Sequence, residues 1–287
     1  MSKSERKLFD ATGTFAHVVR EGKQMNDIRW IDGRILLSNR RLILAAADEK
    51  KTIQISKINR IEGRQDVNRA IAQVSEYVSV RVGSDVYLVS TGEPESFERT
   101  LHKTILDGEI ILLKHPAIEG GVVQNVDWKK ARIKIDRDMV NLAVEDGSFV
   151  QIEIDDVGTI ELDNRSVKSN EQTVLEAEHT EDTTSVKTYL SGRAKHCSVL
   201  SSVFARGVEQ NSSSIDLETA EKEVLMALYS GVSSFEVPEF LDMEPDTVEA
   251  IYERLVELDV LQEVRIRREV TLKPRGRNIA SESMNNQ

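Results

Sequence analysis

The sequence predicts an α+β protein in which two copies of one small, strand-rich domain precede a helical domain. Three observations support this fold class. Residues 30–37 (WIDGRILL) are echoed about 98 residues later by residues 128–135 (WKKARIKI). Each copy shows short alternating apolar segments followed by one helical stripe, and the spacing after residue 214 becomes mainly helical before a final strand pair. Because one period spans a whole domain, the repeat is a duplicated domain and not a solenoid unit.

Bulk composition restricts the class of protein. The 287 residues are 39% hydrophobic and 30% charged, which is typical of soluble globular domains. No apolar run is long enough for a membrane span, and the N-terminus lacks the apolar stretch of a signal peptide. The single cysteine, Cys197, excludes an intramolecular disulfide. We therefore expect a cytoplasmic protein without a membrane span.

The first copy begins with a strand pair and ends with a helix. Its expected strands lie at residues 34–38, 41–45, 53–61, 78–82 and 86–90. A tight polar turn at 39–40 joins the first two strands. Pro94 suits the first turn of a helix, and Phe97, Leu101 and Ile105 form its buried stripe.

The second copy repeats this order after a junction at residues 115–121 (HPAIEGG), where proline and glycines indicate a linker. Its expected strands lie at residues 130–136, 139–145, 149–154, 173–178 and 185–190, and its helix at 194–208. Short antiparallel strands closed by one helix are typical of a pleckstrin-homology-like barrel. The stretch 33–44 resembles the GRAM branch of that fold. The predicted domains are residues 1–115 and 122–209.

The remaining chain predicts a winged helix-turn-helix domain at residues 215–280 and a flexible tail at 281–287. A polar linker at 210–214 precedes it. Helices are expected at residues 217–230, at 235–241 and from Pro245 onward, the last with Val248, Ile251, Leu255 and Leu258 at helical spacing. Residues 264–270 alternate as a strand and pair with 270–273 to form the wing.

The search for catalytic chemistry predicts no enzyme, no cofactor and no metal. The five histidines have no metal-ligand spacing, and no phosphate-binding loop or nucleophile motif is present. His196 and Cys197 adjoin each other, but Cys197 shares one helix face with Leu200, Phe204 and Val208, which favours a core cysteine. The carboxylate pairs Asp136/Asp138 and Asp155/Asp156 are expected to be solvated.

Three binding functions stay open on the residues alone. A winged helix can bind DNA, but the net charge of −11 and an acidic recognition helix disfavour a polyanion. A pleckstrin-like fold can bind anionic lipid through the cations of the first copy. An adaptor would use several protein-docking faces, with complementary charge for steering.

A family resemblance carries the interpretation further. The distinctive segments are residues 66–79 (DVNRAIAQVSEYVS), 115–121 (HPAIEGG), 223–232 (EVLMALYSGV) and 272–281 (LKPRGRNIAS). Together they resemble the archaeal taxis protein family CheF, of the haloarchaeal type, over nearly the whole chain. The resemblance implies a non-enzymatic adaptor that links the phosphorylated response regulator CheY to the archaellum motor. It further implies CheC, CheD and cytoplasmic archaellum accessory or switch proteins as partners, at the cytoplasmic side of the motor, and no nucleic acid.

The expected partner contacts lie mainly on the winged helix. The candidate residues there are Glu249, Tyr252, Glu253, Arg265, Arg267, Arg268, Arg275 and Arg277. A second candidate face, toward the motor, comprises Arg40, Arg41 and Arg64. The alternative function is a winged-helix transcriptional regulator, or a lipid- or protein-binding pleckstrin-like module.

Overall fold

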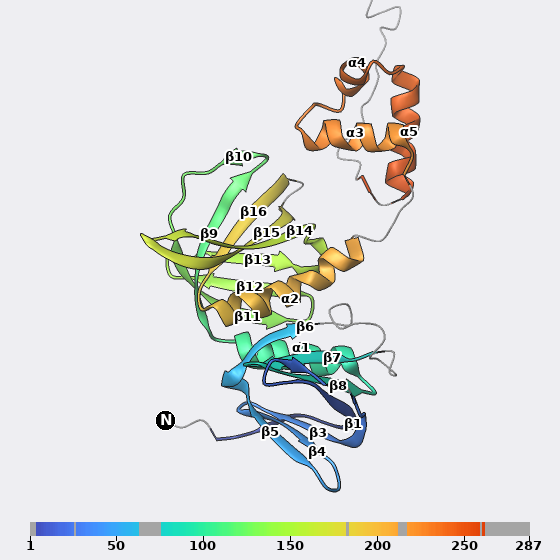
Figure 1. Ribbon diagram of the computed structural model, residues 1–287. Coiled ribbons are helices and arrows are strands. Elements are labelled where there is room, and N and C mark those ends of the chain that lie inside the picture. Colours follow the sequence, from blue (N-terminus) through green and yellow to red (C-terminus); the bar gives the residue numbers. More distant parts are fainter. Residues whose placement is uncertain are drawn as a thin grey trace, which may run out of the picture. The chain divides into compact units, whose positions relative to one another are not determined.

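A computed structural model describes residues 4–25, 27–62, 76–181, 184–211, 217–258 and 260–261 (Figure 1). The chain forms two compact units, Met1–Ser214 and Ile215–Gln287. The first unit contains two curled antiparallel sheets and the helices α1 and α2, whereas the described part of the second is helical. The mixed α+β class is therefore confirmed. Among the described helices, none is both long enough and apolar enough to cross a bilayer.

The first sheet is antiparallel, in the order β5-β4-β3-β1-β8-β7-β6, with β2 paired to β1. Its strands are β1 (Lys7–Arg20), β2 (Lys23–Gln24), β3 (Ile31–Ser38), β4 (Arg41–Ala45), β5 (Lys50–Gln54), β6 (Ile58–Glu62), β7 (Val78–Val82) and β8 (Asp85–Thr91). A short 3₁₀ turn, η1 (Ile55–Lys57), leads from β5 into β6. Helix α1 (Pro94–Leu106) follows the sheet and buries the predicted stripe of Phe97, Leu101 and Ile105.

The second sheet repeats that order as β13-β12-β11-β9-β16-β15-β14, with β10 paired to β9. Its strands are β9 (Ile110–Glu119), β10 (Val122–Val123), β11 (Lys129–Asp136), β12 (Met139–Val144), β13 (Phe149–Glu153), β14 (Thr159–Val167), β15 (Asn170–Glu181) and β16 (Thr184–Ser191). The 3₁₀ turn η3 (Ile154–Asp156) and helix α2 (Ala194–Asn211) occupy the places of η1 and α1. The identical order confirms the duplication.

The junction expected at residues 115–121 is wrong, because most of this segment belongs to β9. In the ladder with β16, Lys114 faces Tyr189 and Ile118 faces Lys187, with a shift in register between them. Pro116 lies inside that irregularity, and the ladder with β11 ends before it. The missing proline amide therefore costs no sheet hydrogen bond, and the strand continues through the proline. The first domain limit at residue 115 falls within this strand.

Five strands have no counterpart in the sequence prediction: the short strands β2 and β10, and the longer strands β1, β9 and β14. Strands β1 and β9, which lie at the centre of their sheets, begin the two copies, and β14 pairs with an extended β15. Strand β1 contains polar and small residues beside apolar ones, and β14 is exposed along most of its length. Neither strand shows the period-two alternation that identifies a half-buried strand.

The two copies share one hydrophobic core. A single cluster of buried side chains includes Leu37 of β3, Ile133 of β11, Leu101 of α1 and Phe204 of α2. Figure 1 shows both helices between the two sheets, and each reaches the sheet of the other copy: α1 packs against β11, and α2 packs against β6. The two copies therefore form one compact body and are not two separate domains joined by a linker.

The end of α1 is joined to the second sheet by one backbone–backbone hydrogen bond and one hydrogen bond from a backbone amide to a side chain. The Gly108 amide donates to the Ile133 carbonyl oxygen (2.8 Å), and the Ile135 amide donates to Asp107 Oδ1 (2.7 Å). Gly108 has a φ of +87°, a conformation that glycine adopts without strain. This junction orients α1 toward the second copy.

The second unit contains α3 (Thr219–Tyr229), α4 (Val237–Leu241) and α5 (Pro245–Glu257) in its described part. A reciprocal capping box between Glu218 and Glu221 begins α3. Among the described residues, the buried core of the unit consists of Val224, Ala227, Val237, Val248, Ile251 and Leu255. The helices expected in this region are confirmed. The predicted wing at 264–273 and the tail at 281–287 lie outside the described residues.

We predict that Gly207→Ala destabilises the protein although alanine is the better helix former. Helix α2 passes so close to η3 that a β-carbon at position 207 would overlap the carbonyl oxygen of Ile154. Overpacking of this kind costs about 1–3 kcal/mol, which exceeds the gain of about 1 kcal/mol in helix propensity. Denaturant unfolding measures the change. Ala205→Gly, at an exposed position of the same helix, measures propensity alone, and a stabilised Gly207→Ala would contradict the packing.

We also predict that both copies unfold together. Each copy carries one of the two tryptophans, Trp30 and Trp128, so Trp128→Phe reports on the first copy and Trp30→Phe on the second. Because the core is continuous, the two fluorescence transitions should have the same midpoint in denaturant and match circular dichroism. Two separated midpoints, after correction for the stability of each variant, would show that the copies are independent.

Candidate functional site

The predicted contact residues on α5 differ in their surroundings. Glu249 and Glu253 are exposed and lie one turn apart on the solvent side of the helix. Tyr252 is half-buried, and its hydroxyl donates to the carbonyl oxygen of Ser234 (2.9 Å). Burial, followed by the charge of Glu249, raises the pKa of the Tyr252 hydroxyl. Tyr252 therefore ties α5 to the segment before α4, and the two glutamates remain available for contact.

The other predicted residues of this face, Arg265, Arg267, Arg268, Arg275 and Arg277, lie outside the described residues. The described helices are strongly acidic without them. Arg254, in α5, pairs its Nε with Oε1 of the buried Glu221 (2.8 Å) and is thus occupied within the unit. The exposed carboxylates are Glu218, Glu223, Glu236, Glu239, Asp242, Glu244, Asp246, Glu249, Glu253 and Glu257. A helix of this charge opposes a nucleic-acid phosphate backbone.

Large apolar side chains on the same unit are exposed, and sequence reasoning missed them. They are Met226 and Tyr229 of α3, Phe235, Phe240 of α4 and Val256 of α5. Tyr229 is 80% exposed and Phe240 63%. Apolar clusters on a small soluble unit are typical of interaction surfaces. The available signal was α3 itself, which carries apolar residues on its solvent side as well as on its core side.

A groove borders these side chains at the end of α3. It is lined by Leu225, Met226, Leu228, Tyr229, Ser230 and Leu261. Its lining is almost entirely apolar in chemical character, whereas the exposed residues around it on α3 and α5 include many carboxylates. The unit thus combines apolar anchors with a negative surround, the composition of a polar-rimmed docking site.

In the second predicted face, the cation of Arg41 is already paired with a carboxylate. Arg41 forms a two-pronged contact with Glu5, with Nε–Oε1 at 2.8 Å and Nη2–Oε2 at 2.9 Å. Hydrogen bonds from Ser38 and then Arg41 lower the pKa of the Glu5 carboxyl. Arg40 is exposed in the turn between β3 and β4, and Arg64 lies outside the described residues. The local charge is therefore weaker than the sequence indicates.

The pair His196-Cys197 is a packing feature, as expected. Both residues are buried, and Cys197 lies in the shared core with Leu200 and Phe204. Burial raises the pKa of the Cys197 thiol, which disfavours the reactive thiolate. Within the described ranges, no three histidine, cysteine or acidic side chains gather in a way that could hold a metal ion.

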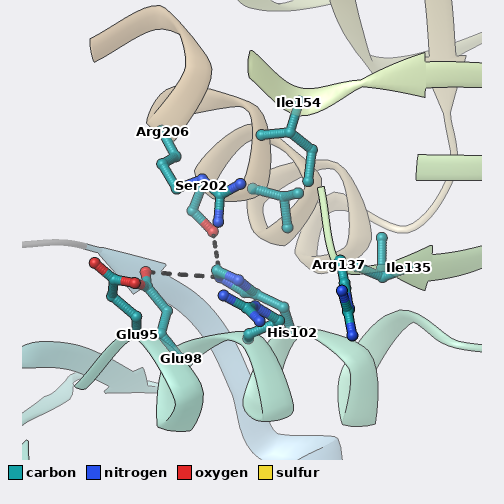
Figure 2. A pocket seen from close by; sticks show the side chains of 10 residues that line it. Glu95, Glu98, His102, Ile135, Arg137, Ile154, Ser202 and Arg206 are labelled. Atoms are coloured by element: carbon teal, nitrogen blue, oxygen red, sulfur yellow. Dashed lines mark hydrogen bonds and ion pairs between the residues drawn. The ribbon is translucent and has the colours of Figure 1, made fainter. Parts of the chain in front are cut away.

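A cavity of about 50 Å³, lined by charged and polar side chains together with Ile135, Ile154 and Val203, lies where the two copies meet, between α1 and α2. Figure 2 shows Glu95, Glu98 and His102 from α1 opposite Ser202 and Arg206 from α2. The Ser202 hydroxyl donates to the Val199 carbonyl oxygen (2.8 Å), so His102 Nε2–H donates to Ser202 Oγ (3.2 Å). His102 thus bridges the two helices.

Two titratable groups in this cavity are shifted by burial. Desolvation, with a smaller effect from Arg206, lowers the pKa of His102 to about 3. Desolvation also raises the pKa of Glu98, whose Oε1 lies 4.0 Å from His102 Nε2. Both shifts have the same first cause, since burial removes the water that stabilises the charged form of each group.

Asp138 and Asp155 are exposed, as expected from the sequence. They also share a contact with Arg206, whose Nη2 lies 2.6 Å from Asp138 and 3.2 Å from Asp155. No spacing in the sequence could predict this contact, since the three residues come from the β11–β12 turn, η3 and α2.

Comparisons with known proteins give a consistent result. Residues 7–210 match the family model described as archaeal chemotaxis signal transduction system protein F. Residues 216–285 match a second model, described as a domain of unknown function. The chain is 48% identical to taxis protein CheF1 of Halobacterium salinarum, over 99% of each chain. It is 22% identical to taxis protein CheF2 of the same organism, over 80% of this chain and 83% of that one.

Proposed function

The chain belongs to the archaeal CheF family of taxis proteins, and on that premise we propose that it is a non-enzymatic adaptor in taxis signalling. It links the phosphorylated response regulator CheY to the archaellum motor. The observation that carries this proposal is the surface of the C-terminal unit, where exposed aromatic side chains lie among carboxylates. An adaptor works through such docking surfaces.

The chemistry of this surface favours a protein partner. Tyr229 and Phe240 can serve as anchors, because large aromatic side chains contribute most of the binding energy at protein interfaces when they become buried. The surrounding carboxylates repel DNA and anionic lipid, and they attract a partner with a basic patch. Selectivity for phosphorylated CheY requires that the surface bind the conformation that phosphorylation favours.

The architecture of the proposed adaptor has three modules. Each sheet with its closing helix is a pleckstrin-homology-like module of the GRAM type, which the repeated strand order and terminal helix support. The C-terminal unit is a winged helix-turn-helix, which the succession α3, α4, α5 supports. The second module begins at Ile110, where β9 starts, and not at residue 122. The winged-helix module spans 215–280, with a tail at 281–287.

The modules divide the work of the adaptor. The C-terminal unit binds CheY through Glu249, Glu253 and the exposed aromatic residues, together with the basic wing. The N-terminal unit docks on the cytoplasmic side of the motor, in part through Arg40, and carries contacts to CheC, CheD and archaellum accessory proteins. Holding both partners on one chain raises the effective concentration of CheY at the motor switch.

We predict that the full-length chain binds its cognate CheY only when CheY carries a beryllofluoride acyl-phosphate mimic, as measured by calorimetry. Phe240→Ser should weaken this binding at least about tenfold, because a buried aromatic anchor is worth more than 1.4 kcal/mol. Phe149→Ser is the matched control, since Phe149 is 57% exposed but lies on the N-terminal unit. No binding with or without the mimic would remove the central claim of the adaptor.

A separate prediction concerns the wing. Reversing the charges of Arg265, Arg267 and Arg268 to glutamate should lower the association rate with CheY and remove much of its salt dependence, because exposed charges act mainly by steering. Stopped-flow kinetics at several salt concentrations measures both effects. Reversal of Arg40, on the other unit, is the control. If the triple variant binds every partner with unchanged rate and affinity, the wing does not form a contact.

A further inference from the structure

The seam cavity contains hydrogen-bond donors that have no acceptor. Nε of Arg99 and Nε of Arg206 are both buried and without a hydrogen-bond partner among the described residues. Both arginines line the same cavity, and Arg137 lines it as a third. More than nine in ten buried polar groups in folded proteins are hydrogen-bonded, so two orphan donors at one cavity indicate a missing acceptor.

The carboxylates nearby do not supply this acceptor. Asp138 and Asp155 both contact Arg206 through Nη2, which leaves its Nε free. Glu95 and Glu98 also line the cavity, but within the described residues neither approaches Arg99 or Arg137 as an ion pair. His102 donates to Ser202 and so is not an acceptor through Nε2.

We propose that the seam cavity is a binding site for one small tetrahedral oxyanion of the phosphate or sulfate class, held by Arg99, Arg137 and Arg206. The size is suitable, because a single water needs about 10–15 Å³ of such space and the cavity offers about 50 Å³. The donors are suitable as well, since a guanidinium presents a fixed fork of N–H groups that matches the oxygens of such an anion.

The placement of the three arginines gives the site a role in joining the two copies. Arg99 comes from α1 of the first copy, Arg206 from α2 of the second, and Arg137 from the turn between β11 and β12. Arg137 has a φ of +22°, which directs this turn out of ordinary strand geometry beside the cavity. The anion contacts both copies at once, and its binding stabilises their shared body. The nearby carboxyl groups of Glu95 and Glu98 disfavour a doubly negative anion, which keeps the affinity of the site for the anion moderate.

The test uses the full-length chain and sodium sulfate, which does not titrate near neutral pH. Sulfate replaces chloride at constant ionic strength, and calorimetry together with thermal unfolding reports binding. We expect a Kd of about 1 mM or lower and a rise in Tm with sulfate concentration. Arg99→Gln and Arg137→Gln should each weaken binding at least about tenfold. Arg81→Gln, at an exposed position of β7, should leave binding unchanged.

Three outcomes would overturn the proposal. Sulfate stabilises many proteins by exclusion from their surface, so an equal rise in Tm for the native chain, Arg99→Gln, Arg137→Gln and Arg81→Gln would show exclusion alone. Absence of a saturable heat of sulfate binding in calorimetry would also overturn the proposal. Displacement of sulfate by acetate at equal concentration would exclude a tetrahedral site. Arg137 is exposed, so Arg137→Gln keeps the test decisive even if Arg99→Gln fails to fold.

Discussion

The packing of helices α1 and α2 between the two sheets is the constraint on which the N-terminal unit depends. Each helix closes the sheet of its own copy and also buries apolar side chains against the other copy, through β11 and β6. A duplicated domain with this arrangement cannot separate without exposing half of a continuous core. The two copies of the duplicated domain therefore depend on each other to keep this core buried. One consequence is the cavity at the seam, which is lined by buried His102 from one copy and by partly exposed Arg206 from the other.

The C-terminal unit follows the opposite principle. Within its described residues, the buried core includes Val224, Val248 and Leu255, and several large apolar side chains face solvent. Among the described residues of this unit, Tyr229 and Phe240 lie outside the buried core, and exposed apolar side chains of this size are typical of interaction surfaces. The boundary between the two matched family models, at residues 210–216, coincides with the boundary between the two units. Each of the two family models therefore matches one of the two units.

Much of this organisation could be predicted from the sequence, and the failures have physical causes. Three features were predictable because the period of apolar residues follows the buried face of an element. They are the repeat beginning at Trp30 and Trp128, the helical stripe that includes Phe97, and the helical spacing after Pro245. Strand β9 was not predicted because Pro116 indicated a linker. The strand tolerates this proline because the missing amide falls at an irregularity of the ladder. The candidate site was harder: Glu249 and Glu253 are exposed as expected, but Tyr252 and Arg41 have partners that are far away in sequence. The seam cavity has no sequence signal, because its residues meet only through the shared core.

The central claim is that the C-terminal helices dock the regulator while the N-terminal unit acts as one rigid scaffold. Hydrogen–deuterium exchange of the full-length chain, with and without beryllofluoride-treated CheY, tests it most directly. The account predicts slower exchange on complex formation in α3, α4 and α5, at residues 219–257, and unchanged exchange across both sheets of the N-terminal unit. Protection confined to the N-terminal unit, with no change in the C-terminal helices, would contradict it.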